Sequence, residues 1–205
     1  MANTKVETPQ AENFDCLVVG VGGQGVVLAS RLIAAACMNE GAFVRTAETI
    51  GMSQRGGSVA SHVRTGSCAE DVPSSLIPAH EADLVLAFEP AEAVRAYSQL
   101  KAGGRMVVAM QPVVPVMAAN SGYDGEAQAD WLKEHIAPEN LAFVDPAVLV
   151  ASGLSAKCLN VMLLGAAIKL GALPFTKEQL QQAMQKLMKP KLIEMNEKAL
   201  ELGIN

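Results

Sequence analysis

Two kinds of apolar pattern alternate along the first half of the chain. Residues 14–19, FDCLVV, form a short apolar run that ends at a glycine, as buried strands do. After the glycine-rich segment 20–25, the stretch VVLASRLIAAACMNE is long and alanine-rich, so it predicts a helix that ends at Gly41. A strand, a glycine turn and a helix in succession indicate an α/β fold.

Further strands and helices follow the same alternation. The stretch SVASHVRT at 58–65 alternates, so His62 and Arg64 would lie on one face of a strand and Val63 on the other. A proline at the first turn predicts a helix from Pro90 through about Leu100. The remaining predictions are strands in AFVRTAE (42–48), DLVLAFE (83–89), GGRMVVAM (103–110) and LAFVD (141–145), and a helix in GEAQADWLKEHI (125–136).

From residue 146 onward the pattern is helical. It predicts helices in AKCLNVMLLGAAIKLG, TKEQLQQAMQKLM and PKLIEMNEKALELG, with Thr176 and Gln179 as a capping box and Pro190 as the first residue of the last helix. We therefore expect a three-layer α/β/α sandwich with a mostly parallel or mixed sheet and a helical C-terminal segment. Residues 1–13 are expected to be a disordered N-terminus, and residues 14–205 a single domain.

Composition narrows the function classes. The 205 residues carry a net charge of −5 without a basic cluster, which argues against an electrostatic nucleic-acid binder. The polar N-terminus lacks an apolar signal core and charged residues break the longest apolar runs, so we expect a cytoplasmic protein without a membrane span. Its cysteines form no CxxC pair, so no metal site or iron–sulfur cluster is expected on this chain alone: Cys16, Cys37, Cys68 and Cys158.

The glycine loop between the first strand and helix is the first candidate site. Gly20, Gly22 and Gly25 satisfy G-x-G-x-x-G, whose glycines allow close backbone approach and whose free N–H groups favour an anion. A dinucleotide fold also requires an acidic residue about 20 residues further on, yet Arg45 stands near that place and Glu48 slightly beyond it. Binding of NAD(P) and tight strand–helix packing both remain open for this loop.

A second glycine-framed loop holds a conspicuous arginine. In GMSQRGG at 51–57, Arg55 could grip a phosphate or carboxylate bidentately, anchor a partner, or be an ordinary turn residue. Ser53 does not lie in a G-x-S-x-G elbow, and His62 on its alternating strand suits a hydrogen-bonded structural or interface residue better than a base. Glu89 is a carboxylate at the end of a strand or, as we favour, a helix N-terminal acid.

Two polar residues interrupt the apolar helix that begins near residue 156. Lys157 and Asn160 are one turn apart, so they are expected to share a face. A cleft or subunit contact and an ordinary exposed stripe remain equal alternatives for this pair, because a buried cation needs a partner whereas lysine often reaches solvent.

Four stretches together resemble one family: GVGGQGVVLASRLIAAA, AETIGMSQRGGSVASHVRTG, SSLIPAHEADLVLAFEPAEAVRAYSQLKAGGRMVV and SAKCLNVMLLGA. They are similar to the gamma-type subunit or domain of the 2-oxoacid:ferredoxin oxidoreductases, and in particular to the small subunit of its indolepyruvate type. The resemblance runs from about Phe14 to the last predicted helix, and GMSQRGGSV is its most specific part.

The resemblance implies a heteromeric enzyme that decarboxylates an aryl-type 2-oxo acid oxidatively to an acyl-CoA and passes the electrons to ferredoxin. It places thiamine diphosphate, Mg²⁺ and [4Fe–4S] clusters on a larger partner chain, with coenzyme A as co-substrate of the complex. This chain would carry no catalytic acid, base or nucleophile. The alternatives are a stand-alone NAD(P)-binding domain and a non-catalytic homo-oligomeric interaction protein; the isolated chain could also form a homodimer.

On this reading, the two glycine loops lie at the carboxyl edge of the sheet and face the partner's active site or coenzyme A. The candidate loop residues are Gly20, Gly22, Gly23, Gln24, Gly25, Gly51, Ser53, Gln54, Arg55, Gly56 and Gly57, and the candidate supporting residues are His62, Arg64, Lys157 and Asn160. The sequence leaves open which 2-oxo acid is the substrate and whether Arg55 contacts a ligand or the partner.

Overall fold

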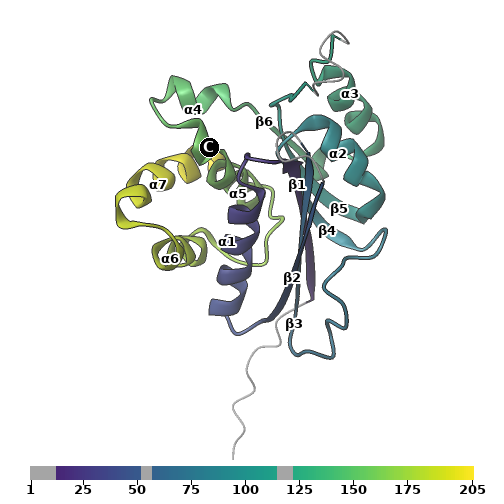
Figure 1. Ribbon diagram of the computed structural model, residues 1–205, viewed down its shortest axis with the longest axis vertical. Helices are drawn as coiled ribbons and strands as arrows, with labels where there is room; N and C mark the ends of the chain where they lie inside the picture. Colours follow the sequence, from purple (N-terminus) through teal and green to yellow (C-terminus); the bar gives the residue numbers. More distant parts are fainter. Residues whose placement is uncertain (1–12, 52–56, 115–121) are drawn as a thin grey trace, which may run out of the picture.

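The computed structural model describes residues 13–51, 57–114 and 122–205. Its centre is a six-stranded sheet in the order β2-β3-β1-β4-β5-β6 (Figure 1). β3 runs antiparallel to both of its neighbours, whereas β1, β4, β5 and β6 pair in parallel, so the sheet is mixed as predicted. The strands are β1 (Phe14–Val21), β2 (Phe43–Ile50), β3 (Ser58–Gly66), β4 (Ala82–Ala87), β5 (Leu100–Ala109) and β6 (Leu141–Val144).

Helices cover both faces of this sheet (Figure 1), which confirms the predicted α/β/α sandwich. One face packs against α1 (Val26–Asn39), α5 (Leu159–Lys169), α6 (Lys177–Leu187) and α7 (Pro190–Ile204). The other face packs against α2 (Pro90–Ala96) and α3 (Glu126–His135). The short helix α4 (Ala147–Ala151) follows β6. No helix in the described part of the chain is long and apolar enough to cross a bilayer.

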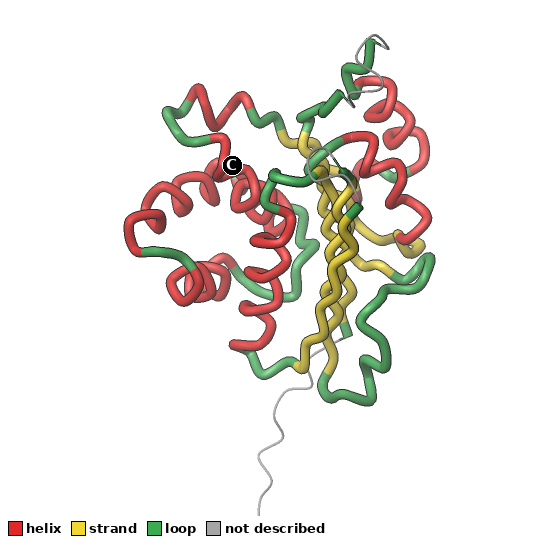
Figure 2. Tube along the Cα trace, in the orientation of Figure 1, coloured by secondary structure: helices red, strands yellow, loops and turns green. Residues whose placement is uncertain are grey.

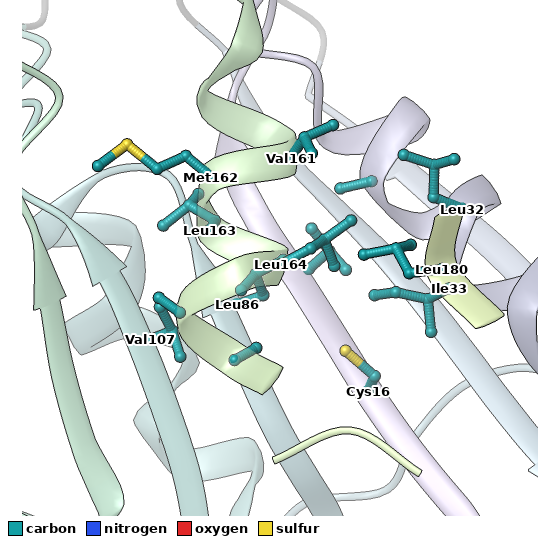
Figure 3. Packing of buried hydrophobic residues seen from close by; sticks show 14 of the residues in the cluster. Cys16, Leu32, Ile33, Leu86, Val107, Val161, Met162, Leu163, Leu164 and Leu180 are labelled. Atoms are coloured by element: carbon teal, nitrogen blue, oxygen red, sulfur yellow. The ribbon is translucent and has the colours of Figure 1, made fainter. Parts of the chain in front are cut away.

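Strand alternation divides the apolar residues between two cores. On β1, Cys16 and Val18 point into the larger core under α1 and α5, and Leu17 and Val19 point into the smaller core under α2 and α3. Figure 3 shows part of the larger core, in which the α5 leucines lie against β1, β4 and β5. The predicted C-terminal helices therefore form one wall of the main core.

Local sequence signals explain the starts of two C-terminal helices. Thr176 and Gln179 form the predicted capping box at the start of α6, and Pro190 opens α7. The helix predicted from Pro90 to Leu100 is wrong at its end, because α2 stops at Ala96 and a 3₁₀ turn follows. Leu100 already pairs with Ala82 in the sheet, and this strand pairing overrides the helical pattern.

Two glycines let α5 and α7 cross closely. A Cβ on Gly203 would collide with the carbonyl oxygen of Met162, and a Cβ on Gly165 would collide with the carbonyl oxygen of Leu200. The backbones of the two helices thus touch where a larger residue would hold them apart. This contact fixes α7 against the helix that begins beside the glycine loop.

Candidate functional site

The glycine loop and the loop before β3 meet at the carboxyl end of β1. Gly22 N–H donates a 2.9 Å hydrogen bond to the carbonyl of Gly57, and Gly51 N–H donates a 2.8 Å bond to the carbonyl of Ser58. In Figure 2 the loops that follow the parallel strands β1, β4 and β5 lie at the upper end of the sheet, whereas the loop that follows the antiparallel β3 lies at its lower end. Among the described residues of the second loop, Gly57 thus contacts the first glycine loop, and Gly51 closes the connection from β2 to β3. Ser53, Gln54, Arg55 and Gly56 lie outside the described residues, so their predicted roles remain predictions.

Glycine is required at two points of the first loop for different reasons. A Cβ on Gly20 would lie 2.8 Å from both the Phe88 Cβ and the Gln24 Oε1, so close packing excludes a side chain there. Gly25 has φ of 94°, in the left-handed region that favours glycine, and it is the N-cap of α1. The loop is therefore shaped both by packing beneath it and by its own backbone turn.

Gln24 uses its side-chain amide inside the fold. Its Oε1 accepts a 2.7 Å bond from Val21 N–H, and its Nε2 donates a 3.1 Å bond to the Phe88 carbonyl. The Nε2 also lies 3.5 Å from the Oε1 of Gln111. These contacts join the carboxyl ends of β1, β4 and β5. Gln24 thus acts on the site by holding the loop in place, and both ends of its amide are already engaged.

The start of α1 leaves several donors available. Within the described residues, the N–H groups of Gly23, Gly25, Val26 and Val27 have no acceptor, as expected for a helix N-terminus. No acidic residue lies in the first turn and no side chain caps it. Because the helix dipole adds partial positive charge here, this end of α1 favours an anion.

Asn160 adds a side-chain donor to the same place. It is 2% exposed, and a Cβ on Gly25 would lie 3.4 Å from its Nδ2. Its Oδ1 accepts a 2.9 Å bond from Val161 N–H, and its Nδ2 is the amide atom that faces Gly25. The Asn160 amide is thus a donor beside Gly25 from which a ligand acceptor at the glycine loop could take a hydrogen bond.

Lys157 does not accompany Asn160, which corrects the expected shared face. Lys157 lies in a 3₁₀ turn (Ala156–Cys158) and is exposed, and α5 begins only at Leu159. Lys157 stands in the exposed turn before the helix, whereas Asn160 lies in the first turn of α5 and is buried. The structure therefore brings only Asn160 of this pair to the glycine loop.

His62 and Arg64 belong to a different region of the sheet. His62 Nδ1 accepts a 3.2 Å bond from Ile77 N–H, and burial together with the Arg64 charge lowers the pKa of the imidazole. Arg64 pairs with Asp15 at 2.8 Å and donates to the carbonyls of residues 74 and 76. Both side chains hold the segment 67–81 against β3, and neither is part of the glycine-loop site.

Arg45 is likewise unavailable for a nucleotide phosphate. Its Nε donates a 2.7 Å bond to the Val72 carbonyl, and its guanidinium lies over the Phe43 ring. In a dinucleotide fold the second strand lies beside the first, whereas β3 here separates β2 from β1. The described residues therefore lack the arrangement that an NAD(P) site of this type requires.

Two buried carboxylates, Glu89 and Glu92, lie beside the loops, and the sequence predicted only part of their role. Glu89 is the N-cap of α2, as favoured from the sequence, and accepts a 2.9 Å bond from Glu92 N–H. It also accepts a hydrogen bond from the Tyr123 hydroxyl, and burial together with this contact raises the pKa of that phenol. Glu92 accepts a 2.6 Å bond from Ser58 Oγ. The signal available in the sequence was an acidic pair at i and i+3 flanking Pro90, but its tertiary partners were not predictable.

The family description "Pyruvate ferredoxin/flavodoxin oxidoreductase" matches residues 15–205 of this chain. The chain belongs to this family. The indolepyruvate oxidoreductase subunit IorB of Thermococcus kodakarensis is 34% identical, covering 94% of this chain and 95% of the relative. The corresponding IorB of Archaeoglobus fulgidus is 36% identical, covering 94% of each chain. The predicted resemblance to the gamma-type subunits, and to their indolepyruvate type, is confirmed.

Solved structures show the same fold. Pyruvate oxidoreductase subunit PORC of Thermotoga maritima has a TM-score of 0.65 at 19% identity, covering 94% of this chain and 96% of that one. The 2-oxoglutarate:ferredoxin oxidoreductase of Magnetococcus marinus, solved with 2-oxoglutarate, coenzyme A and succinyl-CoA, has a TM-score of 0.63 at 20% identity. This chain is covered to 94% there but matches only 30% of the Magnetococcus chain. The same fold thus occurs both as a separate subunit and as part of a longer chain.

Proposed function

We propose that this chain is the small subunit of an indolepyruvate-type 2-oxoacid:ferredoxin oxidoreductase and that its glycine-loop site binds a phosphate group of coenzyme A. In that enzyme, an aryl-type 2-oxo acid is decarboxylated oxidatively, the acyl group passes to coenzyme A, and the electrons pass to ferredoxin. Family membership and the two IorB relatives support the enzyme class. The buried Asn160 amide beside the open N-terminus of α1 is the observation that supports the ligand site.

The redox and carbanion chemistry would then belong to the large partner chain. Within the described residues, no three His, Cys, Asp or Glu side chains are grouped as metal ligands. Burial raises the pKa of Cys37 to about 12 and raises that of Cys16 as well, so both thiols stay protonated. The side chains that this part of the chain offers therefore suit neither an iron–sulfur cluster nor the Mg²⁺ of thiamine diphosphate.

Coenzyme A fits the donors that the loop does offer. Its phosphates are anions with several acceptor oxygens, and they can take hydrogen bonds from successive N–H groups at a helix start without a side-chain cation. The Magnetococcus relative of the same fold was solved with coenzyme A bound. In our proposal, Gly23 and Gly25 allow the phosphate to approach the backbone, and Asn160 donates from the side.

The large subunit would cover this end of the sheet. Exposed apolar side chains follow the carboxyl ends of four strands, and a partner surface would remove them from water. Leu28 follows β1, Ile50 ends β2, Val114 follows β5, and Val148 and Val150 follow β6. In the Magnetococcus protein this fold is only part of a longer chain, which supports a role next to further protein.

The test is steady-state kinetics of the enzyme assembled from this chain and its large partner. Asn160→Leu removes the buried donor at nearly constant volume, and we expect the KM for coenzyme A to rise about tenfold, since a hydrogen bond to a charged group contributes on the order of 1.5–3 kcal/mol. The KM for indolepyruvate should not change. Asn196→Leu is the matched control, because Asn196 is also buried but donates to the Leu192 carbonyl within α7.

Each outcome has a clear meaning. If both asparagine variants leave the KM for coenzyme A unchanged, the assignment of a coenzyme A phosphate to the glycine loop is wrong. If the assembled wild-type enzyme reduces a dye or ferredoxin with indolepyruvate only in the presence of coenzyme A, the enzyme class is supported. Tight binding of NADH to the isolated chain would contradict it.

A further inference from the structure

A buried carboxylate on α2 is connected to the glycine loop through one serine. Glu92 is 5% exposed, and its Oε2 accepts a 2.6 Å hydrogen bond from Ser58 Oγ. Its other oxygen pairs with Arg95, whose side chain is 65% exposed. α2 lies on one face of the sheet and the glycine loop continues into α1 on the other face, so the connection passes across the carboxyl edge (Figure 1).

Ser58 lies at the point where β3 supports the loop. It pairs with Val21 at the end of β1, and its own carbonyl accepts the 2.8 Å bond from Gly51 N–H. The preceding residue, Gly57, supplies the carbonyl that holds Gly22 at 2.9 Å. Any shift of Ser58 would therefore move the acceptor on which the position of Gly22 depends.

The acceptor for Ser58 Oγ is a buried carboxylate, and such a group needs a reason to be buried. Burying an ionised group is costly unless it is paired and hydrogen-bonded, and the exposed Arg95 compensates only in part. A hydroxyl that donates to a carboxylate forms a shorter and stronger bond than one that donates to a neutral acceptor. Ser58 is itself on the surface, so this bond adds little to the core but does fix the start of β3.

We propose that Glu92 is a positioning residue that sets the geometry of the glycine loop through Ser58, Gly57 and Gly22. The hydrogen bond from Ser58 Oγ to Glu92 fixes the first residue of β3. The hydrogen bond from Gly22 N–H to the Gly57 carbonyl then fixes the glycine loop relative to β3. The effect on coenzyme A rests on the proposed function, because it requires the glycine loop to bind that substrate. The effect on the loop itself does not depend on it.

The first measurement uses the full chain alone. Amide hydrogen exchange over residues 20–28 reports the loop, and exchange over α7 serves as an internal reference. Ser58→Ala and Glu92→Leu should each speed exchange of the loop about tenfold, as expected for the loss of a charge-assisted hydrogen bond, and leave α7 unchanged. Ser58→Thr keeps the hydroxyl and suits a strand, so it should exchange like the wild type. Equal loop exchange in all of these chains would overturn the inference.

The second measurement uses the assembled enzyme. Ser58→Ala should raise the KM for coenzyme A while kcat and the KM for indolepyruvate stay within about twofold, and the double variant Ser58→Ala, Glu92→Leu should be no worse than the more severe single variant. An equal loss in kcat and in both KM values would indicate a merely structural role and overturn the proposal. If Asn160→Leu also leaves the KM for coenzyme A unchanged, the coenzyme A assignment fails instead, and the exchange result alone decides the role of Glu92.

Discussion

The N–H of Gly22 is hydrogen-bonded to the carbonyl of Gly57 at 2.9 Å, which makes the two glycine loops of the sequence parts of one structure. Gly22 lies in the turn between β1 and α1, and Gly57 immediately precedes the antiparallel strand β3. Gly57 therefore lies beside the loop that leads into the open N-terminus of α1.

Arg55 is the first residue to test in the loop before β3. It lies outside the described residues, and its prediction rests on the sequence: a guanidinium between glycines suits a carboxylate, a phosphate or a partner loop. We expect Arg55→Ala to leave thermal unfolding of the isolated chain unchanged and to reduce either activity or yield of the assembled enzyme at least tenfold, since a bidentate ionic contact contributes on the order of 1.5–3 kcal/mol. Arg31→Ala, on the exposed side of α1, is the charge-matched control. Wild-type activity together with wild-type yield would exclude Arg55 from the site.

Gln24→Leu should destabilise the chain by about 1–3 kcal/mol, because it leaves Val21 N–H and the Phe88 carbonyl without their partner. Gln24→Glu keeps the acceptor for Val21 and loses the donor to Phe88, so it should fall between Gln24→Leu and the wild type. Urea unfolding followed by circular dichroism measures the difference. A Gln24→Leu chain as stable as the wild type would show that the amide does not hold the loop.

Gly203→Ala should weaken the contact between α5 and α7. The added Cβ would collide with the Met162 carbonyl oxygen and lie 2.9 Å from the Ala166 nitrogen, so the helices must separate. The expected loss is about 1–3 kcal/mol in the free energy of unfolding, although alanine is the better helix former. Lys191→Ala, at an exposed position of the same helix, should change stability by less than about 0.5 kcal/mol. Equal stability of the two variants would contradict the close crossing.

We expect the stability of the segment 67–81 to depend on pH through His62. Burial and the Arg64 charge lower the pKa of His62, while Asp15 opposes this shift, and Nδ1 must be unprotonated to accept from Ile77 N–H. The unfolded chain therefore binds a proton more readily than the folded chain. Stability from this group is full above the ordinary pKa of about 6.5 and falls as the pH drops from there through the lower folded pKa.

His62→Gln offers the test, since the glutamine Oε1 can accept from Ile77 at any pH. Hydrogen exchange of residues 67–81 should increase in the wild type between about pH 6.5 and 5, after correction for intrinsic exchange rates, and should not increase in the variant. The same acid response in both chains would exclude His62 as its cause.

Periodicity predicted the layers well because each strand and helix buries one regular face. The alternation of β3 and the apolar runs of β1 and β4 place the core residues correctly, and capping residues place the starts of α6 and α7. Strand order was beyond the sequence, since the pattern of β2 is the same whether it lies beside β1 or beyond β3. Arg45 is near the sequence position of the acidic residue in a dinucleotide fold, but because β3 separates β2 from β1 it lies away from the glycine loop.

The site was predictable only where its chemistry is local. The glycines of residues 20–25 predict a tight turn at a helix start, and the structure shows that turn. Contacts between distant segments were not visible: Glu92 with Ser58, Gln24 with Phe88, and Asn160 beside Gly25 each require the tertiary fold. The sequence spacing of Lys157 and Asn160 did not reveal that Lys157 lies in the exposed turn before α5 while Asn160 is buried in the helix.

Reconstitution with the large thiamine- and cluster-bearing subunit tests the central claim most directly. The partner alone, the partner with this chain, and the partner with the Asn160→Leu chain would be compared for ferredoxin reduction driven by indolepyruvate and coenzyme A. We predict a stable complex with activity only when this chain is present, and a raised KM for coenzyme A in the variant complex. Full activity of the partner alone, or a partner that never binds this chain, would contradict the account.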